Sequence, residues 1–136
     1  LLETDDNAYV RRATAWSLAN YDNQIVLKPL INALKNDVAA VRLWSSSSLA
    51  EIGNVSLENA QLAAEQLLIS LKIDNEPGVR SNCIWSLCRL YEKLNNTLQE
   101  SFVDECTKIA LFDKEPSVME EAKTALDSMG MQGFYN

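Results

Sequence analysis

The residues of this chain best suited to specific chemistry are three tryptophans and a set of regularly spaced arginines. Trp16 and Trp85 each lie six residues after a valine, and Trp44 lies three residues after another valine. Aromatic residues and arginine are the side chains that protein-binding hot spots favour, and arginine holds carboxylates through two parallel hydrogen bonds. These residue types indicate binding rather than the making and breaking of covalent bonds.

Residue patterns typical of catalysis and of metal binding are absent from the sequence. The chain has no histidine, which excludes Ser-His and Cys-His catalysis and a histidine-based metal site. Its three cysteines, Cys83, Cys88 and Cys106, lack the spacing of a metal site or a disulfide pair, so we interpret them as small hydrophobic residues in a reducing compartment. We predict no catalytic residue, no metal and no cofactor, and an enzymatic activity is disfavoured.

The charge of the chain indicates the class of its partner. The formal net charge is -7, and the longest basic run is Arg11-Arg12. Nucleic acids and anionic membranes attract basic patches, so neither is predicted as a partner. No apolar run approaches the roughly 18 residues of a membrane span. We therefore predict a cytoplasmic protein whose partner is another protein.

Four segments of the sequence align on one valine, and the valines are separated by 31, 38 and 39 residues. Such periods are typical of stacked helical repeats. Positions four, seven and eight residues after each valine share its helical face. This face carries a valine column (Val10, Val41, Val79, Val118), a leucine column (Leu18, Leu49, Leu87, Leu126) and two columns of small residues (Thr14, Ser45, Cys83, Ala122; Ser17, Ser48, Ser86, Ala125).

The elements that must carry these columns are amphipathic helices. We predict helices at 8–21, 23–35, 38–53, 56–72, 77–94, 97–112 and 116–129. A capping box is predicted at Thr97 and Glu100. Aspartates lie just before the valine-bearing helices, where they can cap them: Asp6, Asp37, Asp74 and Asp113.

The predicted fold is all-α, a right-handed α-α superhelix or solenoid of about four repeats, the first of them incomplete. We predict one domain over 1–136, with repeats at approximately 1–21, 22–53, 54–94 and 95–130 and a tail at 131–136. The chain begins at Leu1 without an initiator methionine, so we expect it to be part of a longer protein.

The pattern Asp-x-x-x-Val-Arg followed by small residues and leucine resembles HEAT repeats across essentially the whole chain. The run from Tyr9 to Ala19 and the 31-residue spacing resemble the phycobilisome-lyase-type HEAT-like repeats. The resemblance implies a structural ladder between arginines and aspartates, formed by Arg11, Arg42, Arg80, Asp6, Asp37 and Asp74. It pairs Arg42 with Asp6 or Asp37, and Arg80 with Asp37 or Asp74. Met119 replaces the arginine in the fourth repeat, which suggests an end of the array.

Alternatively, the arginines form a site for carboxylates, such as the propionates of a bilin. The tryptophans lie about 80° and 140° around the helix from the buried stripe, on a face that we predict to be the concave binding surface. Its predicted binding residues are Trp16, Trp44, Trp85, Asn82, Arg89 and Arg12. The alternative for the tryptophans is that they fill gaps between adjacent repeats.

Two functions fit this sequence. The first is a non-catalytic scaffold or adaptor that binds another protein on its concave face. The alternative, which rests on the resemblance, is a bilin-binding subunit of a chromophore lyase or a related phycobiliprotein-handling protein. In that case the tryptophan and arginine side chains would hold the tetrapyrrole.

Overall fold

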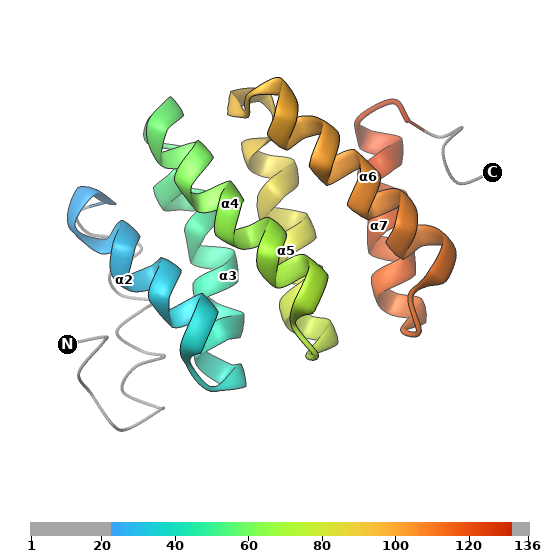
Figure 1. Ribbon diagram of the computed structural model, residues 1–136, viewed down its shortest axis with the longest axis horizontal. Helices are drawn as coiled ribbons and strands as arrows, with labels where there is room; N and C mark the ends of the chain where they lie inside the picture. Colours follow the sequence, from blue (N-terminus) through green and yellow to red (C-terminus); the bar gives the residue numbers. More distant parts are fainter. Residues whose placement is uncertain (1–22, 132–136) are drawn as a thin grey trace.

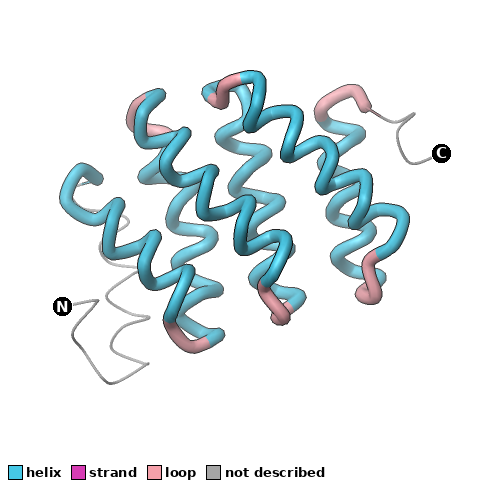
Figure 2. The backbone as a smooth tube through the Cα atoms, in the orientation of Figure 1, coloured by secondary structure: helices cyan, strands magenta, loops and turns pink. Residues whose placement is uncertain are grey.

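The computed structural model describes residues 23–131, and all regular structure in this range is helical (Figure 2). The elements are α2 (Asn23–Asn36), α3 (Ala39–Gly53), α4 (Leu57–Ile73), α5 (Pro77–Leu90), the short 3₁₀ helix η1 (Tyr91–Lys93), α6 (Asn96–Phe112) and α7 (Pro116–Ser128). The predicted all-helical fold is therefore confirmed over this range. The helix predicted at 8–21 lies outside the described residues. None of the described helices combines the length and hydrophobicity needed to cross a membrane.

The helices form two layers of three (Figure 1). Helices α2, α4 and α6 make up one layer, which we call the A layer, and α3, α5 and α7 make up the B layer behind it. Each A helix packs against the B helix that follows it in the chain, and each B helix also packs against the next B helix. The valine-bearing helices are thus side by side in a single layer.

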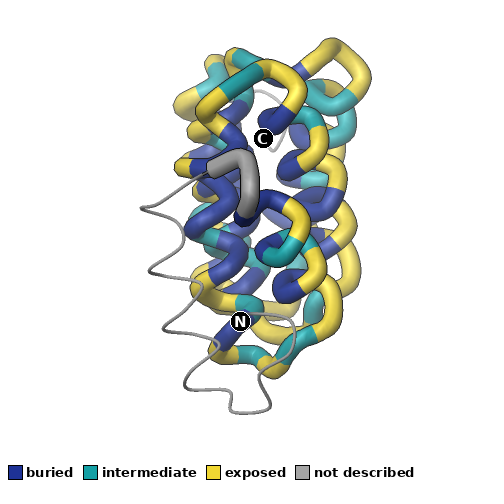
Figure 3. The backbone as a smooth tube through the Cα atoms, turned by 90° about the vertical axis from the view of Figure 1, so that its left-hand side faces the viewer, coloured by how far each residue is buried: buried dark blue, intermediate teal, exposed yellow. Residues whose placement is uncertain are grey.

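The core lies where the two layers face one another (Figure 3). In all three described B helices, the residues of the valine and leucine columns are no more than 1% exposed. The A helices contribute apolar residues at helical spacing, and the largest of them that are fully buried are Leu30, Leu34, Leu67, Leu71 and Phe102. The predicted burial of these columns is confirmed. The sequence was enough to predict it because residues at helical spacing lie on the same face of a helix.

The small-residue columns allow neighbouring helices to approach closely. Ser45, Cys83 and Ala122 are completely buried. The Ser86 hydroxyl on α5 donates a hydrogen bond to the backbone carbonyl of Ser46 on α3, which places the two helix backbones within reach of one side chain. A larger side chain in these columns would force the helices apart.

Two predicted helix ends differ from the structure. The helix predicted at 77–94 is α-helical only to Leu90 and continues as the 3₁₀ helix η1. The backbone carbonyls of η1 accept hydrogen bonds from neighbouring side chains. Gln99 donates to the carbonyl of Tyr91, over 2.8 Å. The capping box predicted at Thr97 is wrong, because the cap of α6 is Asn95, whose side chain accepts a hydrogen bond from the Leu98 amide at 2.9 Å.

Truncation of a leucine in the buried column tests this core. Leu87 is completely buried, so Leu87→Ala should lower the free energy of unfolding by about 3 kcal/mol. Leu57→Ala is the control, because Leu57 is 67% exposed; its loss should stay within about 0.5 kcal/mol. Urea denaturation followed by circular dichroism measures both. Equal losses for the two variants would contradict the assignment of Leu87 to the core.

Candidate functional site

The loops between A and B helices are joined by an arginine of the preceding repeat. Arg42 donates from Nε and Nη2 to the two carboxylate oxygens of Asp74, over 2.8 and 3.1 Å. Its Nη1 donates to the backbone carbonyl of Asp37 at 2.8 Å. Arg42 thus connects its own loop to the loop of the following repeat. Hydrogen bonding to Asp74 raises the pKa of the Arg42 guanidinium above its ordinary value.

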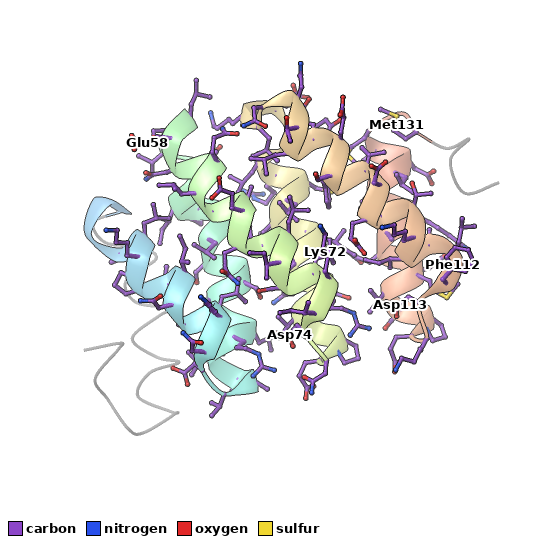
Figure 4. All side chains as sticks on the ribbon, in the orientation of Figure 1. Glu58, Lys72, Asp74, Phe112, Asp113 and Met131 are labelled. Atoms are coloured by element: carbon purple, nitrogen blue, oxygen red, sulfur yellow. The ribbon has the colours of Figure 1, made fainter. Side chains whose placement is uncertain are left out.

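The next repeat uses the same arrangement with fewer hydrogen bonds. Arg80 donates from Nη1 to the backbone carbonyl of Asp74 at 2.9 Å and from Nη2 to the carboxylate of Asp113 at 3.1 Å. Its buried Nε has no hydrogen-bond partner. Asp74 and Asp113 lie at the same edge of the molecule (Figure 4). The Asp113 carboxylate therefore accepts one hydrogen bond from Arg80, whereas the Asp74 carboxylate accepts two from Arg42.

The direction of this ladder differs from the pairing that the sequence suggested. Arg42 was assigned to Asp6 or Asp37 and Arg80 to Asp37 or Asp74, but each carboxylate comes from one repeat further along the chain. Asp6 and Arg11 lie outside the described residues. Asp113, which this direction brings into the ladder, could have been found because it occupies the same place in its repeat as Asp74.

Each aspartate also uses its carboxylate to close its own loop. The Asp37 carboxylate accepts from the Val38 amide at 2.7 Å, and the Asp74 carboxylate accepts from the Glu76 amide at 3.0 Å. Only the aspartate's backbone carbonyl then faces the arginine of its own repeat. The aspartates are also not the predicted helix caps: the N-cap residues of α3 and α5 are Val38 and Glu76.

A second connection between repeats lies at the opposite ends of the helices, and no pattern in the sequence predicted it. Gln61 on α4 donates to the carbonyl of Lys93 at 2.6 Å and accepts from the amide of Asn95 at 2.8 Å. One glutamine amide thus holds, by both of its polar ends, the loop that leads from its own repeat into the following one. Loops on both edges of the stack are therefore fixed by side-chain hydrogen bonds.

The two tryptophans within residues 23–131 are both exposed on the B layer. Trp44 is 37% exposed and Trp85 is 43% exposed. The Arg89 guanidinium lies over the Trp85 ring, 4.9 Å from its centroid, and is 3.8 Å from the carboxylate of Glu51 on α3. Such a cation–π contact contributes about 0.5–1 kcal/mol at an exposed site. Trp16 and Arg12 lie outside the described residues.

Asn82 occupies a different environment from Trp85. Its side-chain amide donates to the carbonyl of Leu43 on α3, over 3.0 Å. This side of α5 therefore faces the preceding B helix. Trp44 has the same place on α3, so it lies on the side of α3 that is turned away from α5. The predicted binding face thus divides into an outward position at Trp85 and a lateral position at Trp44 and Asn82.

Comparison with known families agrees with the stacked pairs and their ladder. A family model described as HEAT repeats matches residues 1–88. The chain belongs to the HEAT-repeat family. No curated protein matches the sequence. The matched part ends within α5, so the loss of the ladder arginine at Met119 falls in the part of the chain beyond the match.

A groove of about 430 Å³ opens on the other side of this HEAT stack, between the C-terminal halves of α2 and α4. Its apolar lining includes Ile69 and Ile73, which are 48% and 75% exposed, and its polar lining includes Arg42 and Asp74. The sequence prediction missed this groove. The only signal for it is that the two isoleucines are apolar but lie off the buried stripe of α4.

The cysteines of the HEAT repeats are held in their uncharged form. Burial raises the pKa of Cys83 and of Cys106 far above the ordinary thiol value. Burial also raises the pKa of Cys88, to about 11, against a smaller lowering by its hydrogen bond to Ser128. Within residues 23–131, no group of three or more potential ligands could hold a metal ion.

Removal of each ladder arginine should reveal their unequal roles. Arg42→Ala removes the two hydrogen bonds that the Asp74 carboxylate, 6% exposed, accepts from arginine, and should cost about 2–3 kcal/mol of unfolding free energy. Arg80→Ala should cost about 1 kcal/mol less, because it breaks one carboxylate hydrogen bond and removes an unpaired buried Nε. Urea denaturation compares the variants. A larger loss for Arg80→Ala would show that the asymmetry is wrong.

Thiol labelling tests the environments of the cysteines. With a pKa of about 11, roughly one Cys88 side chain in a thousand is thiolate at pH 8, so iodoacetamide should react slowly and its rate should keep rising with pH. Cys83 and Cys106 should not react until the protein unfolds. Mass spectrometry of digested samples identifies the labelled sites. Rapid labelling of Cys83 in the folded protein, or a rate for Cys88 that levels off below pH 9, would contradict this description.

Proposed function

We propose that this HEAT-repeat protein is a non-catalytic scaffold that binds another protein on the solvent side of its B layer. The observation that carries the proposal is Trp85, a tryptophan 43% exposed at the centre of the described B layer, with Arg89 stacked on its ring. Tryptophan and arginine are the residues most enriched among binding hot spots. HEAT repeats commonly serve as protein-interaction scaffolds, and the free cysteines favour the cytoplasm as its compartment.

We further propose that the stacked pairs form part of a right-handed superhelix whose concave side is the B layer. The support is a difference in packing: neighbouring B helices pack against each other more extensively than neighbouring A helices do. Closer packing on one side of a stack makes that side concave. The groove between α2 and α4 agrees with a wider spacing in the A layer.

The surface that would meet the partner extends beyond Trp85. Leu43 and Trp44 are each 37% exposed on the same layer. Leu43 lies over the start of α5, where a Cβ added to Gly78 would come within 3.2 Å of it. We call Leu43, Trp44, Trp85 and Arg89 the B-face patch. It combines apolar area with one cation, as the centres of protein interfaces do.

Bilin handling is the competing proposal, and the ladder weakens one part of it. Three of the five N–H groups of Arg42 donate to oxygens of Asp74 and Asp37, which leaves only two of them for a propionate. Arg89 remains available at the surface, with its side chain 51% exposed. A bilin titration separates the proposals: unchanged bilin absorbance and tryptophan fluorescence at micromolar concentrations would exclude bilin handling and leave the scaffold.

Removal of the Trp85 ring is the direct test of the scaffold. The immobilised wild-type chain should retain a partner protein from an extract of its source cells, and the Trp85→Ala variant should not. The affinity for this partner should fall at least tenfold. Leu62→Ala is the matched control, because Leu62 is 41% exposed but lies on α4 in the A layer. Quantitative mass spectrometry and circular dichroism of each variant give the readout. A partner that persists with Trp85→Ala and disappears with Leu62→Ala would overturn the proposal.

A further inference from the structure

The charges around Trp85 bear on the kind of partner that the B-face patch takes. On the α3 side lies Glu51, whose side chain is 63% exposed and is 3.8 Å from Arg89. An ion pair this long and this exposed contributes little binding energy and is easily exchanged for another partner. Arg89 also shows that the Trp85 ring and a neighbouring carboxylate together accommodate a guanidinium.

The α7 side of the patch is also acidic. Glu121 has the same place on α7 that Asn82 has on α5, the side that faces the preceding B helix. The pKa of Cys88 agrees with this placement, since the Glu121 carboxylate contributes to raising it. Cys88 lies one helical turn after Trp85, and α7 packs against α5, so the Glu121 carboxylate lies on the α7 side of the helix that carries the tryptophan. Glu120 precedes it and is exposed.

These two carboxylates have no cation of their own in the described part of the chain. Within residues 23–131, neither Glu120 nor Glu121 forms an ion pair. Lys123, the only basic residue of α7, lies in the same helical column as Ile84, which is buried on α5. This column is on the opposite side of the helix from Glu121. The B-face patch is therefore flanked on its α7 side by carboxylates without an ion-pair partner among the described residues, in a chain of net charge -7.

We propose that the B-face patch binds a basic, partly apolar segment of a partner protein, with an arginine or lysine of that segment placed between Trp85 and the carboxylates of Glu120 and Glu121. Apolar residues of the segment pack on Leu43 and Trp44. A cation at this place gains both the ring face and the carboxylates, which complement its charge. This inference rests on the proposed scaffold function and specifies the chemistry of its partner.

Selection from a random peptide library tests the inference without a known partner. A library of displayed random 16-residue peptides is selected on the full wild-type chain, and each binder is tested again on Trp85→Ala. The expected result is that the binders lost with Trp85→Ala are enriched in arginine and lysine together with apolar residues. Enrichment in acidic or uncharged sequences would overturn the inference while leaving the scaffold function intact. A library without any Trp85-dependent binder would instead contradict the scaffold function, and the inference with it.

Charge reversal tests whether the basic residues of the peptide bind near Glu120 and Glu121. The double variant Glu120→Lys, Glu121→Lys should bind a selected synthetic peptide about tenfold more weakly, and the affinity of the wild-type chain should fall as the salt concentration rises. The matched control is Glu100→Lys, Asp104→Lys, which makes the same change of net charge on exposed positions of α6 in the A layer. Fluorescence anisotropy measures both. Equal weakening by the two double variants would mean that only the total charge of the chain acts, and would overturn the proposed site.

Discussion

Each helical pair of this chain carries an apolar stripe on its B helix that the preceding A helix alone does not cover. The stripe is completed by the neighbouring pair, so burial of apolar surface itself drives the pairs to stack. The small residues beside the stripe set how closely the B helices approach, as the hydrogen bond from Ser86 to the backbone of Ser46 shows. Everything else in the structure is arranged around this contact between B helices.

Stacking by apolar contact alone leaves the rotation and offset of each repeat poorly defined, because the hydrophobic effect has no direction. Directed hydrogen bonds at the two edges supply what is missing. Arg42 and Arg80 connect the loops at one edge, and Gln61 connects the loop at the other. These groups lie at the ends of the helices, whereas the middle of the B layer carries the contacts of Asn82 and Arg89 with α3 and the exposed ring of Trp85. The exposed tryptophan supports the proposed binding role of this surface.

The helical periodicity of the sequence was enough to predict the buried columns, because the face of a helix that a residue occupies depends only on its distance from the valine. Periodicity could not choose the partner of Arg42, since two successive aspartates flank it and the choice depends on the direction in which repeats stack. It also could not separate Asn82 from Trp85. The rotation of α5 against α3 decides which residue touches the neighbouring helix and which faces solvent, and that rotation is a property of tertiary packing.

The central claim is that the partner meets the solvent side of the B layer. Photo-crosslinking tests it most directly, with a benzophenone amino acid placed in turn at Ser47, Thr124, Leu62 and Ile69 of the full chain. Ser47 and Thr124 have the same place on α3 and α7 that Trp85 has on α5, and Leu62 and Ile69 are exposed sites of the A layer on α4. With a peptide or protein that binds the wild-type chain, cross-links should form from Ser47 or Thr124 and not from α4. Cross-links that form only from Leu62 and Ile69 would contradict the account.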